Sequence, residues 1–289
     1  MHAYRETAAA QQRIRYTESG NGEDLGRAIT GGCVLNEENE KNVLGEQVCL
    51  ITGASRGIGE AIARRFYKAG ARLVLLDITI GGAEKVARSL DPSGDRTFCL
   101  QADVTVEQEV QAAVEKAAGR FGRIDVAVNV AGIIRHLPIE KMSLEDFDIV
   151  VRVNLTGTFI VCKAVVPFMK KQGRGKIVNI ASLGGRTGRP GVGVNYAAAK
   201  AGVIGLSQTL AREAGPAGIY VNAIAPGPIL TELTKQAGPE VFAKWNAGRA
   251  VAKDGVPEDV AEAALFLASP QSDWITGVTL DINGGILIR

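Results

Sequence analysis

A glycine-rich turn between an apolar run and a helix-like segment constrains the fold of this chain more than any other feature. The run Gln47–Thr52 precedes glycines 53, 57 and 59, and helical spacing of apolar residues continues through Glu60–Lys68. A strand, a glycine turn and a helix in this order form the first half of a nucleotide-binding βαβ unit. The glycine spacing, three residues and then one, differs from the one-then-two spacing of the commoner Rossmann loop.

Each glycine of this turn has a separate steric role. Gly53 permits the tight turn, Gly57 lets backbone N–H groups approach a pyrophosphate at the helix N-terminus, and Gly59 lets the helix pack closely on the sheet. A turn without function is the alternative, which the flanking strand and helix disfavour. The predicted cofactor-binding residues of the turn are Gly53, Ser55, Arg56, Gly57, Ile58 and Gly59.

Strand-like and helix-like segments alternate along the rest of the chain. The expected strands cover residues 47–52, 72–77, 97–102, 124–129, 176–181, 219–224 and 278–282. The main helices are expected at about 60–68, 78–90, 106–120, 144–171, 195–214 and 257–268. Near-continuous Val, Ile and Leu in the strands indicates a parallel sheet that is buried on both faces. The prediction is an α/β fold, a single-domain doubly wound Rossmann-type parallel sheet with helices on both faces and ligands at the carboxyl ends of the strands.

Residues 1–45 differ from the remainder because they are polar and carry only one short apolar patch. We expect a poorly ordered N-terminal extension at 1–45 and a Rossmann-type domain at 46–289. The net charge of +2, without a basic cluster, favours neither a nucleic-acid nor a membrane partner. No apolar run is expected to span a bilayer, and the first residues lack the apolar core of a signal peptide, so a cytoplasmic protein is expected.

The cysteines and histidines restrict the possible chemistry. Cysteines 33, 49, 99 and 162 form no Cys-x-x-Cys pair, and the last three lie in apolar segments typical of buried reduced thiols. The two histidines, His2 and His136, are too few for a metal cluster, and they make a Ser-His-Asp triad improbable. We therefore expect no metal and a base other than histidine.

Tyr196 and Lys200 are spaced i and i+4, so one face of a helix presents both side chains. An ammonium group near a tyrosine favours the phenolate. A tyrosine that acts as a base at pH 7 needs its pKa lowered by roughly three units, or about 4 kcal/mol, which one lysine and a bound pyridinium cation together are expected to supply. In isolation the pair is typical of an exposed helix surface, but downstream of the glycine turn it indicates acid–base chemistry.

Asp77 ends the second strand, 24 residues after Gly53. A carboxylate at this position accepts hydrogen bonds from the ribose hydroxyls of an adenosine and repels a 2′-phosphate. Arg56 has the opposite preference, because a guanidinium group pairs with phosphate. Asp77 meets the phosphate at closer range, so the sequence favours NAD, with NADP as the less favoured cofactor.

These residues and several others follow the order seen in the short-chain dehydrogenase/reductase family. The resemblance extends from Gln47 to Gly285. Within the family, the chain is similar to the branch that includes 3-oxoacyl-carrier-protein reductases and sugar, polyol and secondary-alcohol dehydrogenases. The segments that carry it are Thr52–Gly59, Asp103-Val104, Asn129–Gly132, Asn154, Ser182, Tyr196, Lys200 and Pro226-Gly227.

The resemblance implies four catalytic residues. Tyr196 would be the general acid and base, and Lys200 would lower its pKa and hold the nicotinamide ribose. Ser182 would donate a hydrogen bond to the same substrate oxygen, and Asn154, inside the long helix, would anchor a water that links Lys200 to solvent. Asparagine is a poor helix former, which agrees with such a role.

The resemblance also implies the remaining cofactor contacts. Asp103 would bind the adenine amino group and Val104 would contribute its backbone. The floor beneath the cofactor would come from Asn129, Ala131 and Gly132. The carboxamide side of the nicotinamide would be covered by Pro226, Gly227, Ile229 and Thr231.

Two positions depart from the family pattern. Val130 stands where the family often has a second asparagine, which we expect to change packing rather than chemistry. Ser182 and Tyr196 are 14 residues apart where 13 is commoner, so the loop Leu183–Val194 carries one extra residue. This loop is expected beside the substrate, and its length bears on specificity.

The resulting hypothesis is an NAD-dependent homotetrameric oxidoreductase that interconverts a secondary alcohol and a ketone, acting on a small polar hydroxyl compound. One alternative is an NADPH-dependent 3-oxoacyl thioester reductase, and another is a catalytically silent nucleotide-binding redox sensor. Residues Thr231–Lys253 are expected to cover the substrate as a lid.

The substrate contacts stay open at this point. His136 is either a substrate contact or an exposed loop residue, and Trp245 either lines the pocket or packs the lid. Four arginines near the expected pocket either bind an anionic substrate group or are ordinary surface charges. They are Arg135, Arg186, Arg189 and Arg249.

Overall fold

The computed structural model describes residues 42–235 and 238–289. The N-terminal extension expected at 1–45 therefore falls almost entirely outside the described residues. Leu44 belongs to the described part: its side chain is fully buried in the core and its backbone N–H donates to the carbonyl of Ala69 at 2.9 Å. The folded body thus begins before residue 46, where the sequence analysis placed the boundary.

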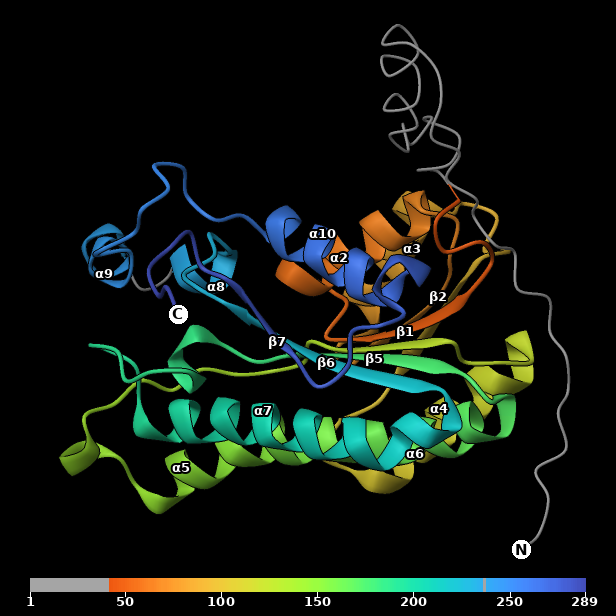
Figure 1. The fold of residues 1–289 in the computed structure, drawn as a ribbon, viewed down its shortest axis with the longest axis horizontal. Helices are drawn as coiled ribbons and strands as arrows, with labels where there is room; N and C mark the ends of the chain where they lie inside the picture. Colours follow the sequence, from red (N-terminus) through yellow and green to blue (C-terminus); the bar gives the residue numbers. More distant parts are fainter. Residues whose placement is uncertain (1–41, 236–237) are drawn as a thin grey trace, which may run out of the picture. The chain divides into compact units, whose positions relative to one another are not determined.

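Seven parallel strands form one sheet in the order β3-β2-β1-β4-β5-β6-β7 (Figure 1). The strands are β1 (Val48–Thr52), β2 (Arg72–Asp77), β3 (Thr97–Gln101), β4 (Val126–Asn129), β5 (Gly175–Ile180), β6 (Ile219–Pro226) and β7 (Thr279–Ile282). The chain winds outward from β1 to β3 and then in the opposite direction from β4 to β7. The predicted doubly wound sheet is confirmed, and its reversal point lies between β1 and β4, where such folds bind their ligands.

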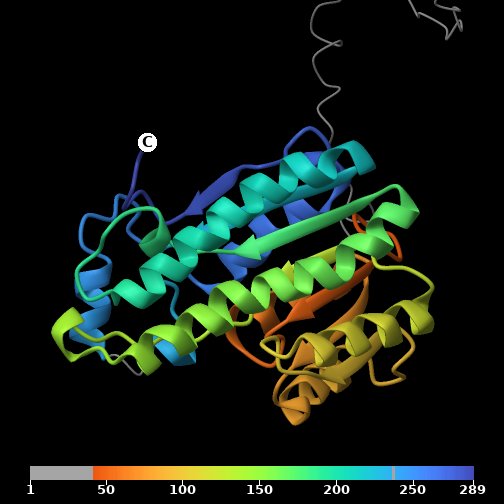
Figure 2. The same cartoon turned by 90° about the horizontal axis from the view of Figure 1, so that it is seen from below.

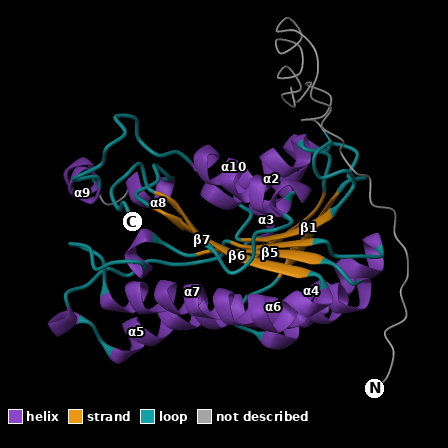
Figure 3. Cartoon of the chain, viewed as in Figure 1, coloured by secondary structure: helices purple, strands orange, loops and turns teal. Residues whose placement is uncertain are grey.

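Helices cover both faces of this sheet (Figures 1 and 3). One face is covered by α2 (Gly57–Lys68), α3 (Ile80–Leu90) and α10 (Pro257–Ala268). The other face is covered by α4 (Glu107–Phe121), α6 (Gly157–Gln172) and α7 (Val194–Ala214), with α5 (Leu144–Val151) preceding α6. Figure 2, seen from below, shows α6 and α7 (green and teal) running alongside each other in front of the strands.

The alternation of side chains along the strands explains why the apolar runs are nearly continuous. In β1, Ile51 packs into the core on the α2 side, whereas Leu50 packs into the core on the α4 side. The same alternation separates Leu75 from Val74 in β2. Successive side chains of a strand point to opposite faces, and both faces here are covered by helices, so every position is apolar.

The long helix expected at 144–171 is continuous but not uniform. Between α5 and α6 the backbone forms one π-helical turn, Arg152–Thr156, with Asn154 fully buried inside it. A π turn carries an extra residue relative to the α-helix and frequently lies at a functional site. The sequence analysis placed Asn154 in the helix but did not predict this turn.

The same helical run is long and apolar enough to cross a membrane by composition, which the sequence analysis had not expected. The stretch Leu144–Gln172 has a mean hydropathy of 1.7 over its most apolar part, and 56% of that part is buried inside the protein. Val161, Val165 and Met169 belong to the core between α6 and the sheet. The run serves as a core helix of the domain.

The expected lid contains more regular structure than its sequence indicated. Within Thr231–Lys253, the structure has the short helices α8 (Glu232–Lys235) and α9 (Pro239–Trp245). Pro239 stands in the first turn of α9, where its missing N–H needs no partner.

Candidate active site

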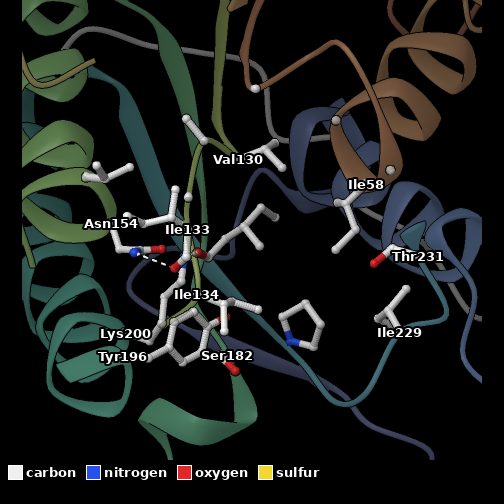
Figure 4. Close-up of a pocket in the computed structure, with 18 of the residues that line it drawn as sticks. Ile58, Val130, Ile133, Ile134, Asn154, Ser182, Tyr196, Lys200, Ile229 and Thr231 are labelled. Atoms are coloured by element: carbon white, nitrogen blue, oxygen red, sulfur yellow. Dashed lines mark hydrogen bonds between the residues drawn. The ribbon is translucent and has the colours of Figure 1, made fainter. Parts of the chain in front are cut away.

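A cavity of about 1050 Å³ opens at the carboxyl ends of the strands. The glycine turn lies at one end and Ser182, Tyr196 and Lys200 at the other (Figure 4). Of the residues predicted for the site, all but Asn129 line this cavity. The structure therefore brings together residues that are up to 178 positions apart in the sequence, from Gly53 to Thr231.

The glycine turn closes tightly on its neighbours. Gly53 has a positive φ of +64°, and a Cβ atom there would lie 2.9 Å from the Cα of Ala131 in the turn after β4. A Cβ atom at Gly59 would collide with the carbonyl oxygen of Gly53. Because no side chain intervenes, the first turn of α2 lies against the end of β1 with its backbone exposed to the cavity, as binding of a pyrophosphate requires.

The carboxylate of Asp77 is fixed at the end of β2. Its Oδ2 accepts a hydrogen bond from the backbone N–H of Ser55 at 3.1 Å, and its Oδ1 accepts one from Thr79 at 2.9 Å. These bonds hold the carboxylate against the glycine turn. Arg56 lies in the same turn with an exposed side chain and no hydrogen-bond acceptor among the described residues.

Lys200 is anchored beneath the inner end of the cavity. Its side chain is buried, and Nζ donates to the backbone carbonyl of Ile180, the last residue of β5, at 2.7 Å. Nζ also lies 5.8 Å from the centre of the Tyr196 ring. Ser182 follows β5 by two residues, and its Oγ accepts a hydrogen bond from the backbone N–H of Gly184 at 3.1 Å. Figure 4 shows the three side chains grouped at this end of the cavity.

Burial opposes ionisation at this end of the cavity. It raises the pKa of Tyr196, and a hydrogen bond with Ser182 partly offsets the rise. Burial also lowers the pKa of Lys200 to about 8. The expectation that Lys200 shifts the pKa of Tyr196 downward is therefore not met by the protein groups alone, because desolvation of the phenolate is the larger effect. Lys200 carries its positive charge below about pH 8 and loses it above.

Asn154 lies in the π turn, close to Lys200. Its Nδ2 donates to the carbonyls of Ile133 and Val150, both at 2.9 Å, whereas its buried Oδ1 has no partner among the described residues. A Cβ atom on Gly132 would lie 2.5 Å from this Oδ1 and 3.7 Å from Nζ of Lys200. Gly132 thus leaves room where an acceptor and a cation face the same space.

Asn129 does not line the cavity, although the resemblance predicted a cofactor contact. Its side chain is buried beneath the site, where Nδ2 donates to Oδ1 of Asn179 at 2.8 Å. The Asn179 Nδ2 donates in turn to Oγ of Ser207 at 2.9 Å. Asn129 therefore ties β4 to β5 and α7, while Ala131 and Gly132 form the cavity floor.

Apolar residues make up much of the lining. Val130, noted as a departure from the family pattern, lines the cavity. Leu183 and Val192 also line it, and they belong to the loop that was expected beside the substrate. Ile133 and Ile134 follow the carboxyl end of β4, where such a fold binds its ligands. The cavity-lining positions of Ile149 and Val153 were not predicted.

His136 lines the cavity rather than lying exposed in a loop. Its ring makes edge-to-face contacts with Tyr196 at 5.4 Å and with Trp245 at 5.9 Å between ring centres. Nδ1 accepts a hydrogen bond from the backbone N–H of Gly193 at 3.1 Å, and burial lowers the pKa of the imidazole. A neutral ring whose Nδ1 accepts carries its proton on Nε2.

The four arginines considered for anion binding separate into two groups. Arg135 pairs with Asp146 at 2.7 Å, Arg186 with Asp281 at 2.9 Å and Arg249 with Asp254 at 2.5 Å. Only Arg135 and Arg189 line the cavity. Arg189 donates to the backbone carbonyl of Trp245 at 2.6 Å and has no carboxylate partner among residues 42–235 and 238–289.

Comparison with known proteins agrees with this geometry. Residues 53–287 match a family model described as enoyl-(acyl carrier protein) reductase. The chain is 42% identical over 243 residues to the 3-oxoacyl-[acyl-carrier-protein] reductase FabG of Thermotoga maritima, which covers 84% of this chain and 98% of that protein. This chain belongs to the short-chain dehydrogenase/reductase family.

Two further similarities are informative. The chain is 41% identical over 253 residues to the D-threitol dehydrogenase of Mycolicibacterium smegmatis, covering 84% of this chain and 94% of that protein. The crystal structure of gox2181 superposes with a TM-score of 0.82 at 34% identity, over 87% of this chain and 99% of the other. The family binds a nicotinamide dinucleotide. The turn beside Asp77 fits such a molecule, because its glycines leave the backbone open to the cavity.

We predict that His136 titrates below the ordinary histidine pKa and is the Nε2–H tautomer at pH 7. Burial and the Gly193 N–H bond both disfavour the imidazolium. The measurement is a histidine side-chain nitrogen NMR titration of the full chain, whose only other histidine is His2. His136→Ala assigns the resonances. A pKa above 6.5, or protonation at Nδ1, would contradict the structure.

Proposed function

We propose that this oxidoreductase interconverts a secondary alcohol and a ketone with NAD, using Tyr196 as its general acid and base. Membership of the family already makes the chain an oxidoreductase that acts on CH–OH groups. The observation that supports the proposal is the grouping of Ser182, Tyr196 and Lys200 in one cavity with the glycine turn. This grouping also argues against a silent redox sensor, which needs no acid or base.

Tyr196 and Ser182 would act on the same substrate oxygen. In the oxidation, the Tyr196 phenolate takes the hydroxyl proton of the alcohol, and in the reduction the phenol returns it. The Ser182 hydroxyl donates a hydrogen bond to this oxygen and stabilises the charge that develops on it. The nicotinamide ring, when bound, accepts or supplies the hydride of the carbinol carbon.

Lys200 would stabilise the ionised tyrosine from beneath. Its ammonium is held in place by the Ile180 carbonyl and is charged below about pH 8, so it opposes the desolvation that raises the pKa of Tyr196. Asn154 offers an unpartnered Oδ1 beside the same ammonium. We propose that a water bound there passes protons between Lys200 and solvent.

The choice of NAD is supported by the fixed carboxylate of Asp77. Hydrogen bonds from Ser55 and Thr79 prevent the carboxylate from moving away, so the 2′-phosphate of NADP would meet a negative charge. Arg56, by contrast, lies exposed. The remaining predicted contacts, Asp103, Val104, Pro226, Gly227, Ile229 and Thr231, line the cavity in positions that agree with a dinucleotide.

A second candidate function is reduction of a 3-oxoacyl thioester with NADPH. The specific observation in its favour is the similarity to 3-oxoacyl-[acyl-carrier-protein] reductases of several bacteria. These relatives support the acyl substrate better than the small polar hydroxyl compound expected from the sequence, while the threitol dehydrogenase supports the latter. The apolar residues Ile134, Leu183 and Val192 of the lining also agree with an acyl chain.

A soluble cytoplasmic homotetramer is the proposed assembly. Phe159 on α6 is 50% exposed, and Ala198, Ala201 and Gly205 on α7 are exposed small residues that permit a close approach of another copy. Gly202 has a different role, because it packs against Leu155 within the chain.

Light scattering of the full chain at micromolar concentration tests this assembly. The expected result is a mass four times that of the 30.4 kDa chain, and Phe159→Glu should shift it toward smaller species because a charge would be buried at the interface. Ile139→Glu, on a 72% exposed residue outside α6 and α7, is the matched control. A monomeric wild type would contradict the proposal.

Tyr196→Phe tests the catalytic role. Removal of the phenol oxygen should reduce kcat by about 100-fold or more, as expected for loss of a general acid–base group, while binding of NADH stays nearly unchanged. Turnover is followed by NADH absorbance over secondary alcohols and ketones, and binding by NADH fluorescence. Full turnover in the variant would exclude the mechanism, and NADH binding by a wild type that turns over nothing would favour the sensor.

Asp77→Ala tests the cofactor. The wild type should prefer NAD, and loss of the carboxylate should raise kcat/KM for NADP by about tenfold or more, because repulsion of the phosphate is removed. Arg56→Gln is the companion variant: it should lower any residual use of NADP and leave NAD little changed. A wild type that prefers NADPH would contradict the proposal and favour the 3-oxoacyl reductase.

A further inference from the structure

The acidic residues of the cavity lining lie away from the end that contains Tyr196. These three residues are Asp77 at the end of β2, Asp103 after β3, and Glu232, which follows Thr231. Thr231 lies beside the glycine turn, where a Cβ atom on Gly57 would be 3.7 Å from its methyl group. The part of the lining around Tyr196 therefore contains no carboxylate.

Besides Lys200, which meets the Ile180 carbonyl, Arg189 is the cation at the Tyr196 end that has no carboxylate partner among the described residues. The neighbouring Arg135 is neutralised by Asp146, whereas Arg189 meets only the carbonyl of Trp245 among the described residues. That bond uses one N–H of a guanidinium with five, and it fixes the group against the lid helix α9. Nε and Nη1 keep their donor capacity.

Two neutral donors accompany this cation. His136 has its Nδ1 occupied by the Gly193 N–H, so the free donor of its ring is Nε2–H. The indole Nε1–H of Trp245 is buried without an acceptor, beside Gly191 in the loop that carries the extra residue. We call His136, Arg189 and Trp245 the donor rim. Trp245 contacts both other members, and His136 also contacts Tyr196.

We propose that the donor rim binds a carboxylate of the substrate, so that the chain acts on a hydroxy acid and its oxo acid. The inference rests on the proposed function, because it places the carboxylate on the same molecule as the carbinol. In the oxidation the carbinol carbon loses its hydride to NAD and its hydroxyl proton to Tyr196, and the carboxylate is unchanged.

A carboxylate matches the charge and the donors of the rim. The Lys200 ammonium faces the Tyr196 phenolate in the proposed reaction, and His136 is neutral, so Arg189 supplies the positive charge that a substrate anion would meet. A carboxylate monoanion balances this charge, whereas a phosphate dianion would keep one negative charge uncompensated. Arginine binds the two oxygens of a carboxylate with parallel N–H bonds. An alkyl chain would cover these donors without any acceptor, which is costly, and the hydroxyls of an uncharged polyol would accept hydrogen bonds without balancing the charge of Arg189.

The activity test compares matched pairs of substrates. The 2-, 3- and 4-hydroxy acids are each assayed with NAD against their N-methyl amides, which keep the carbinol and remove the charge. We expect at least one acid to exceed its amide in kcat/KM. Arg189→Gln should raise KM for that acid by about 10- to 100-fold and affect the amide little, because one charge-assisted contact is lost. Arg189→Lys should restore part of the preference.

Two controls show whether the effect of Arg189→Gln comes from loss of the donor rim, from a general change of charge or from misfolding. Arg135→Gln removes a cavity-lining arginine that is already paired with Asp146, and it should keep the preference for the acid. NADH binding by Arg189→Gln should equal that of the wild type, since the glycine turn lies at the other end of the cavity.

A binding measurement makes the test independent of turnover. The chain has two tryptophans, and Trp274 is 99% exposed, so Trp274→Phe leaves Trp245 as the only reporter. In this background with NADH bound, the hydroxy acid should change the Trp245 fluorescence saturably, and Arg189→Gln should remove the change. The amide should produce no change at the same concentration.

The outcomes are distinct. The carboxylate site would be overturned by two results together. The enzyme would turn over amides, 3-hydroxyacyl thioesters or sugar phosphates in preference to every acid, and the acids would not change the Trp245 fluorescence. The oxidoreductase proposal would stay intact in that case. A saturable response that depends on Arg189, without turnover of any compound, would support the site and contradict the proposed function.

Discussion

A short chain of buried amides and a hydroxyl holds the centre of the molecule in register. The Asn129 amide donates to Asn179 on the neighbouring strand, and the Asn179 amide donates to Ser207 on α7. Asn129 and Asn179 are direct partners in the β4–β5 ladder. Because buried polar groups are costly without partners, a slip of β4 by one residue would lose the bond between Asn129 and Asn179 and turn the side chains of β4 to the opposite face of the sheet. The positions of Ser182, which follows β5, and of Lys200 on α7 depend on this register.

The catalytic groups that this register positions are buried. Lys200 and Tyr196 both sit where burial penalises their charged forms, and the structure compensates with single, well-placed groups: a strand carbonyl for the ammonium and a serine hydroxyl for the phenol. Burial brings the pKa of Lys200 to about 8, close to neutral pH, whereas it moves the pKa of Tyr196 away from neutrality, so ionisation of the tyrosine needs positive charge beside it. The cofactor end differs, since Asp77 and the glycine turn rely on backbone N–H groups.

Much of this arrangement follows from local sequence. Arg72–Asp77 and Pro257–Ala268 were predicted with the observed bounds, because apolar runs and a proline at a helix start are local signals. The cavity position of Asp77 followed from the rule that ligands meet the carboxyl ends of strands.

The features of the site that the sequence does not predict depend on contacts between distant segments. The pairing of Arg186 with Asp281 spans 95 residues, and the contact of His136 with Trp245 joins two loops without any shared pattern. The location of Asn129 beneath the cavity rather than in it is set by Asn179, 50 residues away. The π turn at Asn154 escaped prediction as well, because five ordinary helix residues carry no mark of a wider turn.

That π turn also governs the phase of the longest helix. An α-helix advances about 100° per residue, and a π turn takes up one extra residue within a single wide turn, so the helix that follows keeps its phase. If the same residues formed plain α-helix with no change of length, α6 would be rotated by about 100° relative to α5. Val161 and Met169 would leave the sheet, while Phe159 would turn to a new side. The packing of α6 against the sheet therefore depends on the width of this one turn, so a substitution that restores α-helical geometry at Asn154 would disturb side chains that it does not touch.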